Sequence, residues 1–238
     1  MMISRATDEP GGRPCSECSI RWLTVCAALG DDDLRELEHL SRHMHFSPGE
    51  TVFAEEEMTT SFYNLQSGVM RLYKLLRDGR RQIIGFALPG DFLGLAASSR
   101  HSVSADAIGP VELCRFSRPA FARFSEHKPE LLRRINELAV RELGQAQDHI
   151  VLLGRRSADA KVATFLIRWR DRMAKISEPP RSVVSLPMSR QDIADYLGLT
   201  IETVSRTFTK FERDGVIEIV PGGICLVDPA RAQALASG

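Results

Sequence analysis

Short stretches in which apolar and polar residues alternate fill the chain between about residues 46 and 116. Val69–Tyr73 and Gln82–Phe86 are two of them. Residue pairs that favour tight turns separate the stretches, and these pairs include Pro48-Gly49, Ser67-Gly68, Asp78-Gly79, Pro89-Gly90 and Gly109-Pro110. Short strands at such regular spacing predict a β-sandwich or jelly roll.

Helical spacing marks the segments on both sides of this region. Leucines at positions 34, 37 and 40 predict a short helix from Asp31 to His43, capped by one of the aspartates at 31–33. A longer helical stretch runs from Pro119 to Gly154, with a break expected near Pro129. A further helix is expected from Ser157 to Ile176.

The longer stretch carries a seam of apolar and small residues at steps of three and four: Ile135, Ala139, Leu143, Ala146, Ile150 and Leu153. Such a heptad-like seam predicts pairing with a second copy of the chain, because the small alanines let two helices approach closely. A helix that packs on its own sandwich also needs an apolar stripe, so this alternative stays open.

The C-terminal third, after a linker at residues 178–182, has the pattern of a helix-turn-helix. Ser189 caps one short helix, Gly198 supplies the turn, and Thr200 caps a second helix that ends at Asp214. The small Ala194 lets the helices cross closely and the β-branched Val204 fills their contact. Strand signals from Gly215 to Val227 predict a β-hairpin wing. The second helix of this motif enters the DNA major groove.

One face of that second helix carries the side chains suited to reading DNA. Glu202, Ser205 and Arg206 share the face near the start of the helix. Arginine can bond to guanine and glutamate can accept from cytosine, so we assign these three to base contacts. A solvated salt bridge between Glu202 and Arg206 is the alternative. Contacts to the DNA backbone are expected from Arg190, Thr209, Lys210 and Arg213.

The composition is that of an ordinary globular protein. The 238 residues are 43% hydrophobic and 26% charged, with 31 Lys and Arg against 31 Asp and Glu. No apolar run is long enough for a membrane span, and the first fourteen residues, expected to be mobile, lack a secretory signal. We therefore expect a cytoplasmic protein with reduced thiols. No nucleotide-binding loop or catalytic constellation is present, which argues against an enzyme. His39, His43 and His45 are expected at the surface.

Four of the five cysteines suggest a metal site. Cys15, Cys18 and Cys26 follow a C-x2-C-x7-C pattern, and Cys114 stands alone before the long helix. Four thiolates are what an iron–sulfur cluster or an all-cysteine zinc site requires, although zinc sites usually show two C-x-x-C pairs. Unpaired thiols are the third possibility. Cys225 lies in a wing strand and is expected to be structural.

From about Cys15 to Val227 the chain resembles the cyclic-AMP receptor protein/FNR superfamily. The segment Gln191–Arg206 is the most specific part, and its E-x-x-S-R element is similar to that of the FNR branch. The resemblance implies a homodimeric, oxygen-responsive transcription regulator, mainly an activator, that binds a palindrome of TTGAT half-sites and contacts RNA polymerase. It assigns base contacts to Glu202, Ser205 and Arg206.

The same resemblance implies a [4Fe-4S] cluster held by Cys15, Cys18, Cys26 and Cys114. The seven-residue gap is longer than in the best-known members, although variants of the branch share it. An intact cluster is expected to order the N-terminal segment against the long helix and so to favour dimerisation and DNA binding. The alternative is a family member without redox sensing, whose cysteines are free or hold structural zinc. Cyclic-nucleotide receptors have a Gly-Glu pair that Pro89–Arg100 lacks, so no cyclic nucleotide is expected.

We therefore predict an α+β protein with four parts. They are a cluster-binding segment at 1–30, a jelly-roll sensor domain at 31–118, a dimerisation helix at 119–156, and a winged helix-turn-helix domain at 157–238.

Overall fold

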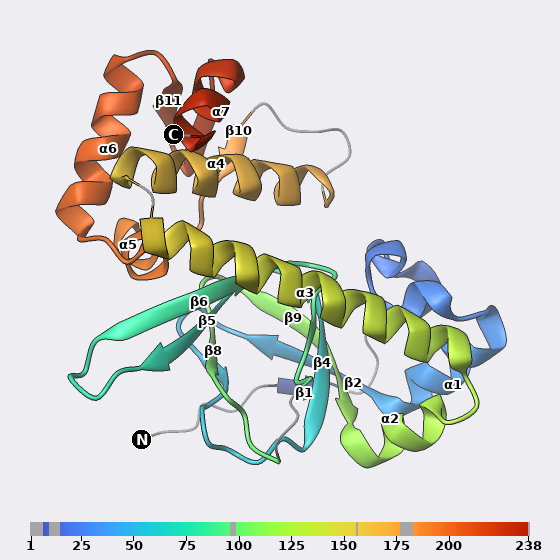
Figure 1. Cartoon of the computed structure of the whole chain (residues 1–238). Helices are drawn as coiled ribbons and strands as arrows, with labels where there is room; N and C mark the ends of the chain where they lie inside the picture. Colours follow the sequence, from blue (N-terminus) through green and yellow to red (C-terminus); the bar gives the residue numbers. More distant parts are fainter. Residues whose placement is uncertain (1–6, 10–14, 96–98, 156, 177–182, 238) are drawn as a thin grey trace. The chain divides into compact units, whose positions relative to one another are not determined.

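The computed structural model describes residues 7–9, 15–95, 99–155, 157–176 and 183–237 (Figure 1). Contacts divide the chain into two compact units, of which the first comprises Met1–Leu75 and Ile84–Gly144 and the second comprises Leu76–Ile83 and Gln145–Gly238. The linker predicted at 178–182 lies outside the described residues. So does most of the N-terminal stretch predicted to be mobile, but its residues 7–9 form a strand. None of the described helices is long and apolar enough to cross a bilayer.

The first unit is built on a β-sandwich, which confirms the fold predicted from the alternating stretches. One sheet has the strand order β1-β2-β9-β4-β7, and the other has the order β3-β8-β5-β6. The strands are β1 (Thr7–Glu9), β2 (Ser41–Phe46), β3 (Thr51–Phe53), β4 (Ser61–Ser67), β5 (Met70–Leu75), β6 (Arg81–Ala87), β7 (Phe92–Leu93), β8 (Ser104–Ala107) and β9 (Val111–Ser117). Strand β6 runs from the second unit into the first.

Strand β9 is buried on both of its faces. Val111 and Leu113 point into the core between the two sheets. Cys114 and Phe116 belong to a separate core that also contains Cys26. This division follows from the two-residue period of a strand, which sends alternate side chains to opposite faces. Cys114 is thereby placed on the outer face of the first sheet, where helices and the N-terminal segment cover it.

Helix α1 (Asp31–Leu40) buries Leu34 and Leu37, as its leucine spacing predicted. It ends three residues before the predicted end, because residues 41–46 pair with β9 as strand β2. The prediction of an aspartate cap was also wrong. Gly30 is the N-cap residue, and the three aspartates occupy the first turn, where negative charge is favourable.

The predicted break near Pro129 is confirmed. Helix α2 (Arg118–Ser125) ends before it, and helix α3 (Pro129–Arg155) begins with the proline itself. Proline is well suited to a first helical position, because its missing N–H would have no intrahelical partner there. Helix α3 continues for 27 residues and runs from the first unit into the second.

The second unit contains the predicted helix-turn-helix and wing. Its elements are α4 (Ala158–Ala174), β10 (Val183–Ser185), α5 (Arg190–Leu197), α6 (Ile201–Arg213), β11 (Ile217–Val220), β12 (Gly223–Leu226) and α7 (Pro229–Ser237). Strand β10 extends the wing hairpin to a sheet of order β10-β12-β11. Leu166, Ile193, Phe208 and Phe211 are fully buried and form much of the core.

Candidate functional sites

The segment that carries the first three cysteines is a series of short 3-10 turns. Cys15 opens the first turn (Cys15–Glu17), and Cys26 lies in the third (Val25–Ala28). The fully buried Thr24 caps this third turn, since its hydroxyl accepts a 3.0 Å hydrogen bond from the backbone N–H of Cys26. The N–H of Cys15 donates to Glu38 of α1 at 3.0 Å. These local bonds fix the backbone at two of the cysteines.

Strand β9 brings the fourth cysteine to the same place. Cys114 pairs in register with His43 on β2 and with Asn64 on β4, and all three residues are buried. His43 was predicted at the surface, and its burial follows from its position opposite Cys114 in the sheet. The side-chain oxygen of Asn64 has no hydrogen-bond partner among the described residues. A buried polar atom of this kind is unusual in a completed core.

The four thiols lie close enough for their charges to act on one another. Burial is the main cause that raises the pKa of Cys114, and the other three cysteines add to it. Burial, together with the charges of Cys26 and Glu38, raises the pKa of Cys15 to about 12. Burial also raises the pKa of Cys26. At neutral pH these three thiols are therefore protonated, and a metal that binds them must displace the protons.

Four cysteine thiols are the donor set of an all-cysteine metal centre. Within the described part of the chain, no three His, Cys, Asp or Glu side chains are placed to ligate one metal ion. A tetrahedral zinc site would need its sulfurs about 2.3 Å from a shared ion. As placed, the thiols therefore do not form a single-ion site within the described part of the chain.

The first turns of α3 pack against the cysteine segment. Leu131 is fully buried in the core that contains Cys26 and Cys114. The guanidinium of Arg134 donates to the carbonyls of Leu23 at 3.1 Å and of Thr24 at 3.3 Å. Helix α3 therefore holds the chain between the second and third cysteines.

The helix-turn-helix has the predicted caps and contacts. Ser189 and Asp192 form a reciprocal capping box at the start of α5. Gly198 ends α5 with φ +60°, a left-handed conformation that favours glycine. Ala194 and Val204 are fully buried. Each sequence feature that predicted this motif is therefore confirmed.

The face of α6 predicted to read DNA is open. Glu202, Ser205 and Arg206 are all exposed. Hydrogen bonds from the backbone of Glu202 and from Thr200, with the nearby Arg206, hold the pKa of Glu202 below its usual value. The helix therefore presents an ionised carboxylate, a hydroxyl and a guanidinium.

The residues predicted to contact the DNA backbone have different environments. Arg190 stacks over the ring of Phe208, with 3.4 Å between its guanidinium carbon and the ring centroid. Lys210 forms an ion pair with Asp159. Arg213 is exposed, as is Thr209, whose hydroxyl donates to the Ser205 carbonyl at 3.2 Å. A role for Arg190 or Lys210 at a phosphate would therefore require it to leave or share its present partner.

Three of the six residues of the predicted seam of α3, those at its centre, are exposed, and Ile135, Ala139 and Leu153 are half-buried. Leu143 and Ile150 are 59% and 69% exposed, and Ala146 is exposed between them. Ile135 instead packs partly against the core that contains the cysteines, so its side chain is divided between that core and the surface. Leu153 is half-buried and lies near Gly198. The exposed centre of the seam is available for a second copy of the chain.

Two further predictions concern cyclic-nucleotide binding and Cys225. Arg100, at the end of the stretch that lacks the Gly-Glu pair, is exposed and donates to the Glu56 carbonyl. Phe92 and Leu93 are buried. The absence of cyclic-nucleotide binding stays a prediction. Cys225 lies on β12, where it pairs with Val183 and Glu218.

Two family models match the chain. Residues 186–217 match "Bacterial regulatory proteins, crp family", and residues 43–128 match "Cyclic nucleotide-binding domain". The first match covers the helix-turn-helix, and the second covers most of the β-sandwich.

Several known proteins are similar over nearly the whole chain. The nitrogen fixation regulation protein FixK of Bradyrhizobium diazoefficiens is 66% identical over 229 residues, with 96% of each chain covered. The transcriptional activatory protein AadR of Rhodopseudomonas palustris is 56% identical over 227 residues, with 95% of each covered. The solved structure of FixK2 from Bradyrhizobium japonicum has a TM-score of 0.77 at 35% identity, covering 83% of this chain and 98% of that one.

Proposed function

The chain belongs to the Crp/FNR family of bacterial transcription regulators, and from this premise we propose that it is a transcriptional activator whose DNA binding responds to oxygen. Its relatives are regulators and not enzymes, in agreement with the prediction from the sequence. Several of them carry the name of a transcriptional activator. The observation that supports the oxygen response is the packing of Cys15, Cys26 and Cys114 in one core with the first turns of α3.

In this proposal Cys15, Cys18, Cys26 and Cys114 hold a [4Fe-4S] cluster. Four cysteine thiolates are the usual ligand set of such a cluster. When bound, the cluster supplies an iron–sulfur centre that oxygen can attack. The chain contributes two cysteines held by local bonds, Cys15 and Cys26, and a third fixed on the rigid strand β9. The burial of Cys26 and Cys114 excludes water from that side of the site.

The link from this site to DNA binding is helix α3. Arg134 and Leu131 connect the cysteine segment to the first turns of the helix. Leu143 and Ile150 on the same helix are exposed, and pairing of two copies there would cover them. A dimer would place two α6 helices on successive major grooves of a palindrome, about 34 Å apart. The cysteine segment thus acts on dimerisation by supporting the start of the helix that pairs.

The experiment is to purify the full chain without oxygen and to measure iron, sulfide, zinc, the visible spectrum and the oligomeric state. Binding to a duplex with palindromic TTGAT half-sites is measured in the same preparation, before and after exposure to air. We expect about four irons and four sulfides per chain, with bleaching, loss of the dimer and weaker DNA binding in air.

Two results would contradict parts of the proposal. Zinc or no metal, with a dimer that is stable in air and still binds the palindrome, would leave the DNA-binding function and remove the oxygen response. A full cluster whose loss in air changes neither the dimer nor DNA affinity would separate the cluster from regulation.

A further inference from the structure

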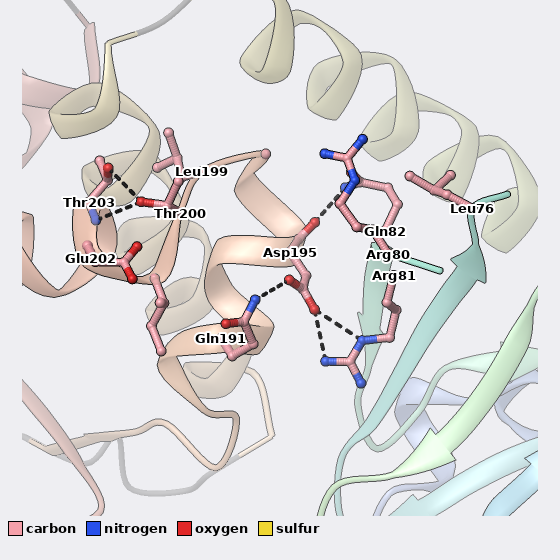
Figure 2. A pocket seen from close by; sticks show the side chains of 12 residues that line it. Leu76, Arg80, Arg81, Gln82, Gln191, Asp195, Leu199, Thr200, Glu202 and Thr203 are labelled. Carbon is pink, nitrogen blue, oxygen red and sulfur yellow. Dashed lines mark hydrogen bonds and ion pairs between the residues drawn. The ribbon is translucent and has the colours of Figure 1, made fainter. Parts of the chain in front are cut away.

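The second unit contains a segment, Leu76–Ile83, that contacts the first helix of the helix-turn-helix. The guanidinium of Arg81 bonds to Oδ2 of Asp195 through Nε at 3.1 Å and through Nη2 at 2.9 Å. The same Nη2 lies 2.6 Å from Oδ1 of Asp192. The neighbouring Gln82 donates to the backbone carbonyl of Asp195 at 2.6 Å (Figure 2). Two consecutive residues of β6 therefore bind the middle of α5.

The carboxylates of Asp192 and Asp195 are each fixed by further hydrogen bonds within α5 and its cap. Asp192 is only 4% exposed, and its other oxygen accepts from the N–H and hydroxyl of Ser189 in the capping box. Asp195 accepts a further bond of 2.6 Å from Gln191. A buried carboxylate is stable only when it is paired and hydrogen-bonded. Arg81 supplies the positive charge for this part of α5.

A tight turn joins α5 to the recognition helix. The turn is short, with Gly198 at its start and Thr200 capping α6 through the N–H of Thr203 at 3.2 Å. Ala194 and Val204 close the contact between the helices without leaving exposed surface. A hollow of about 770 Å³ beside the Arg81 contact is lined by the 76–83 segment, by α5 and by the first turn of α6, including Glu202 (Figure 2). Because the turn is short and the contact between the helices is buried, a shift of α5 would also move α6.

We infer that Arg81 is a positioning residue for DNA recognition: its bonds to Asp192 and Asp195 set the position of α5, and through it the position of the base-reading face of α6. The inference rests on the DNA binding proposed above. The contact supports that binding and does not mask it, because Glu202, Ser205 and Arg206 stay exposed while Arg81 is bound to α5.

The neighbouring arginine offers a matched control. Arg80 is exposed and pairs with Asp78 of its own turn at 2.7 Å, and among the described residues it forms no hydrogen bond to α5. Arg80→Gln and Arg81→Gln remove the same charge from adjacent positions. A difference between them therefore reports the contact with α5 and not the general attraction between a cation and DNA.

The test measures affinity of the anaerobically purified full chain for a fluorescent TTGAT palindrome, with the dimer fraction and circular dichroism recorded for every variant. We expect Arg81→Gln to weaken binding about tenfold or more while the protein stays folded and dimeric, because one partner of a largely buried ion pair is lost. Arg80→Gln should change the affinity less than about threefold. Arg81→Lys, which keeps the charge without the two-pronged geometry, should fall between them.

A double-mutant cycle tests whether the loss of affinity arises from the Arg81–Asp195 pair, while circular dichroism and the dimer fraction report any general loss of stability. Asp195→Asn should weaken DNA binding in the wild type and have little further effect in Arg81→Gln. Equal effects of Arg80→Gln and Arg81→Gln, or additive effects in the cycle, would overturn the inference. If Arg81→Gln binds DNA with unchanged affinity, the inference about Arg81 fails and the proposed function stands. If the wild-type chain does not bind the duplex, the proposed function fails as well.

Discussion

The guanidinium of Arg134 donates a 3.1 Å hydrogen bond to the backbone carbonyl of Leu23. It also reaches the carbonyl of Thr24, so one side chain of α3 binds two consecutive peptide groups between Cys18 and Cys26. Neither bond involves a cysteine. The contact therefore offers a way to separate the presence of the cluster from its effect on the helix.

Replacing Arg134 with Gln should weaken the dimer without emptying the cysteine site. Hydrogen bonds from a charged donor contribute about 1.5–3 kcal/mol, which corresponds to roughly a 10- to 100-fold change in an equilibrium constant. Iron and sulfide per chain should stay near the wild-type values. Anaerobic sedimentation equilibrium measures the dimer, and metal analysis of the same sample measures the cluster.

The control for this prediction is Arg133→Gln. Arg133 is exposed on the same turn and pairs with Glu130 and Glu137 on its own helix. It should leave both the dimer and the cluster unchanged. If Arg134→Gln dimerises as the wild type does, α3 does not carry the signal through this contact.

Replacing Cys114 with Ser should abolish cluster loading, whereas Cys225→Ser should not. The two cysteines lie in different units, on β9 and on β12, and only Cys114 is close to the other three thiols. Serine keeps the size of the side chain but provides a poorer ligand for iron. Iron and sulfide analysis with the visible spectrum gives the result. A Cys114→Ser protein that still carries a full cluster would show that the fourth ligand lies elsewhere.

Much of the fold could be predicted from local signals. The residues Ser189, Gly198 and Thr200 act through neighbouring backbone groups, so their roles are visible in the sequence alone. The grouping of Cys15, Cys18 and Cys26 could also be predicted, because the three cysteines lie within twelve residues of one another in the sequence. The start of β2 was missed because the leucine spacing of α1 extends to residue 40 and nothing local marks the change from helix to strand at Ser41.

The sequence could not predict the contacts that depend on tertiary packing. Arg134 lies 110 positions from Thr24, and Arg81 lies 114 positions from Asp195. An arginine on a helix or a strand end carries no sign of a distant partner. Thr24 is different, because a threonine two residues before Cys26 is a common capping residue and could have been recognised. The partial burial of Ile135 in the cysteine-containing core could not be predicted either, because it depends on how α3 packs in the folded chain.

Replacing Arg206 with Ala should relax sequence preference at one base pair of each half-site. The side chain is exposed on the open face of α6, and a good bidentate contact to a base is worth about 1–3 kcal/mol of discrimination. Arg213→Ala is the comparison, since Arg213 is exposed at the last residue of the same helix and was assigned to the DNA backbone.

Arg206→Ala and Arg213→Ala should affect different properties of DNA binding, the first its sequence preference and the second its salt dependence. Binding to a set of duplexes with single base-pair changes measures preference, and binding at several salt concentrations measures phosphate contacts. Arg213→Ala should weaken all duplexes alike and reduce the salt dependence by about one phosphate contact. An unchanged preference profile for Arg206→Ala would move that residue to the phosphate class.

His149 should make the second unit sensitive to acid. The residue lies on α3, is 8% exposed, and stacks on the ring of Tyr196 in α5 with 4.1 Å between ring centroids. Burial lowers its pKa below the ordinary value of 6.5, and Arg168 and Lys161 of α4 lower it further. The unfolded chain therefore binds a proton at this position more readily than the folded chain.

The sign of the effect follows from this difference. The stability associated with neutral His149 is fully present above about pH 6.5 and is lost as the pH falls below it, by at most about 1.4 kcal/mol per pH unit. His149→Phe keeps an aromatic ring against Tyr196 and removes the proton-binding group. Urea unfolding at pH 7.5, 6.5 and 5.5 should therefore show a smaller acid-induced loss for His149→Phe than for the wild type. His127→Gln, at an exposed position, is the control and should follow the wild type. If His149→Phe loses as much stability on acidification as the wild type, another group is responsible for the acid sensitivity.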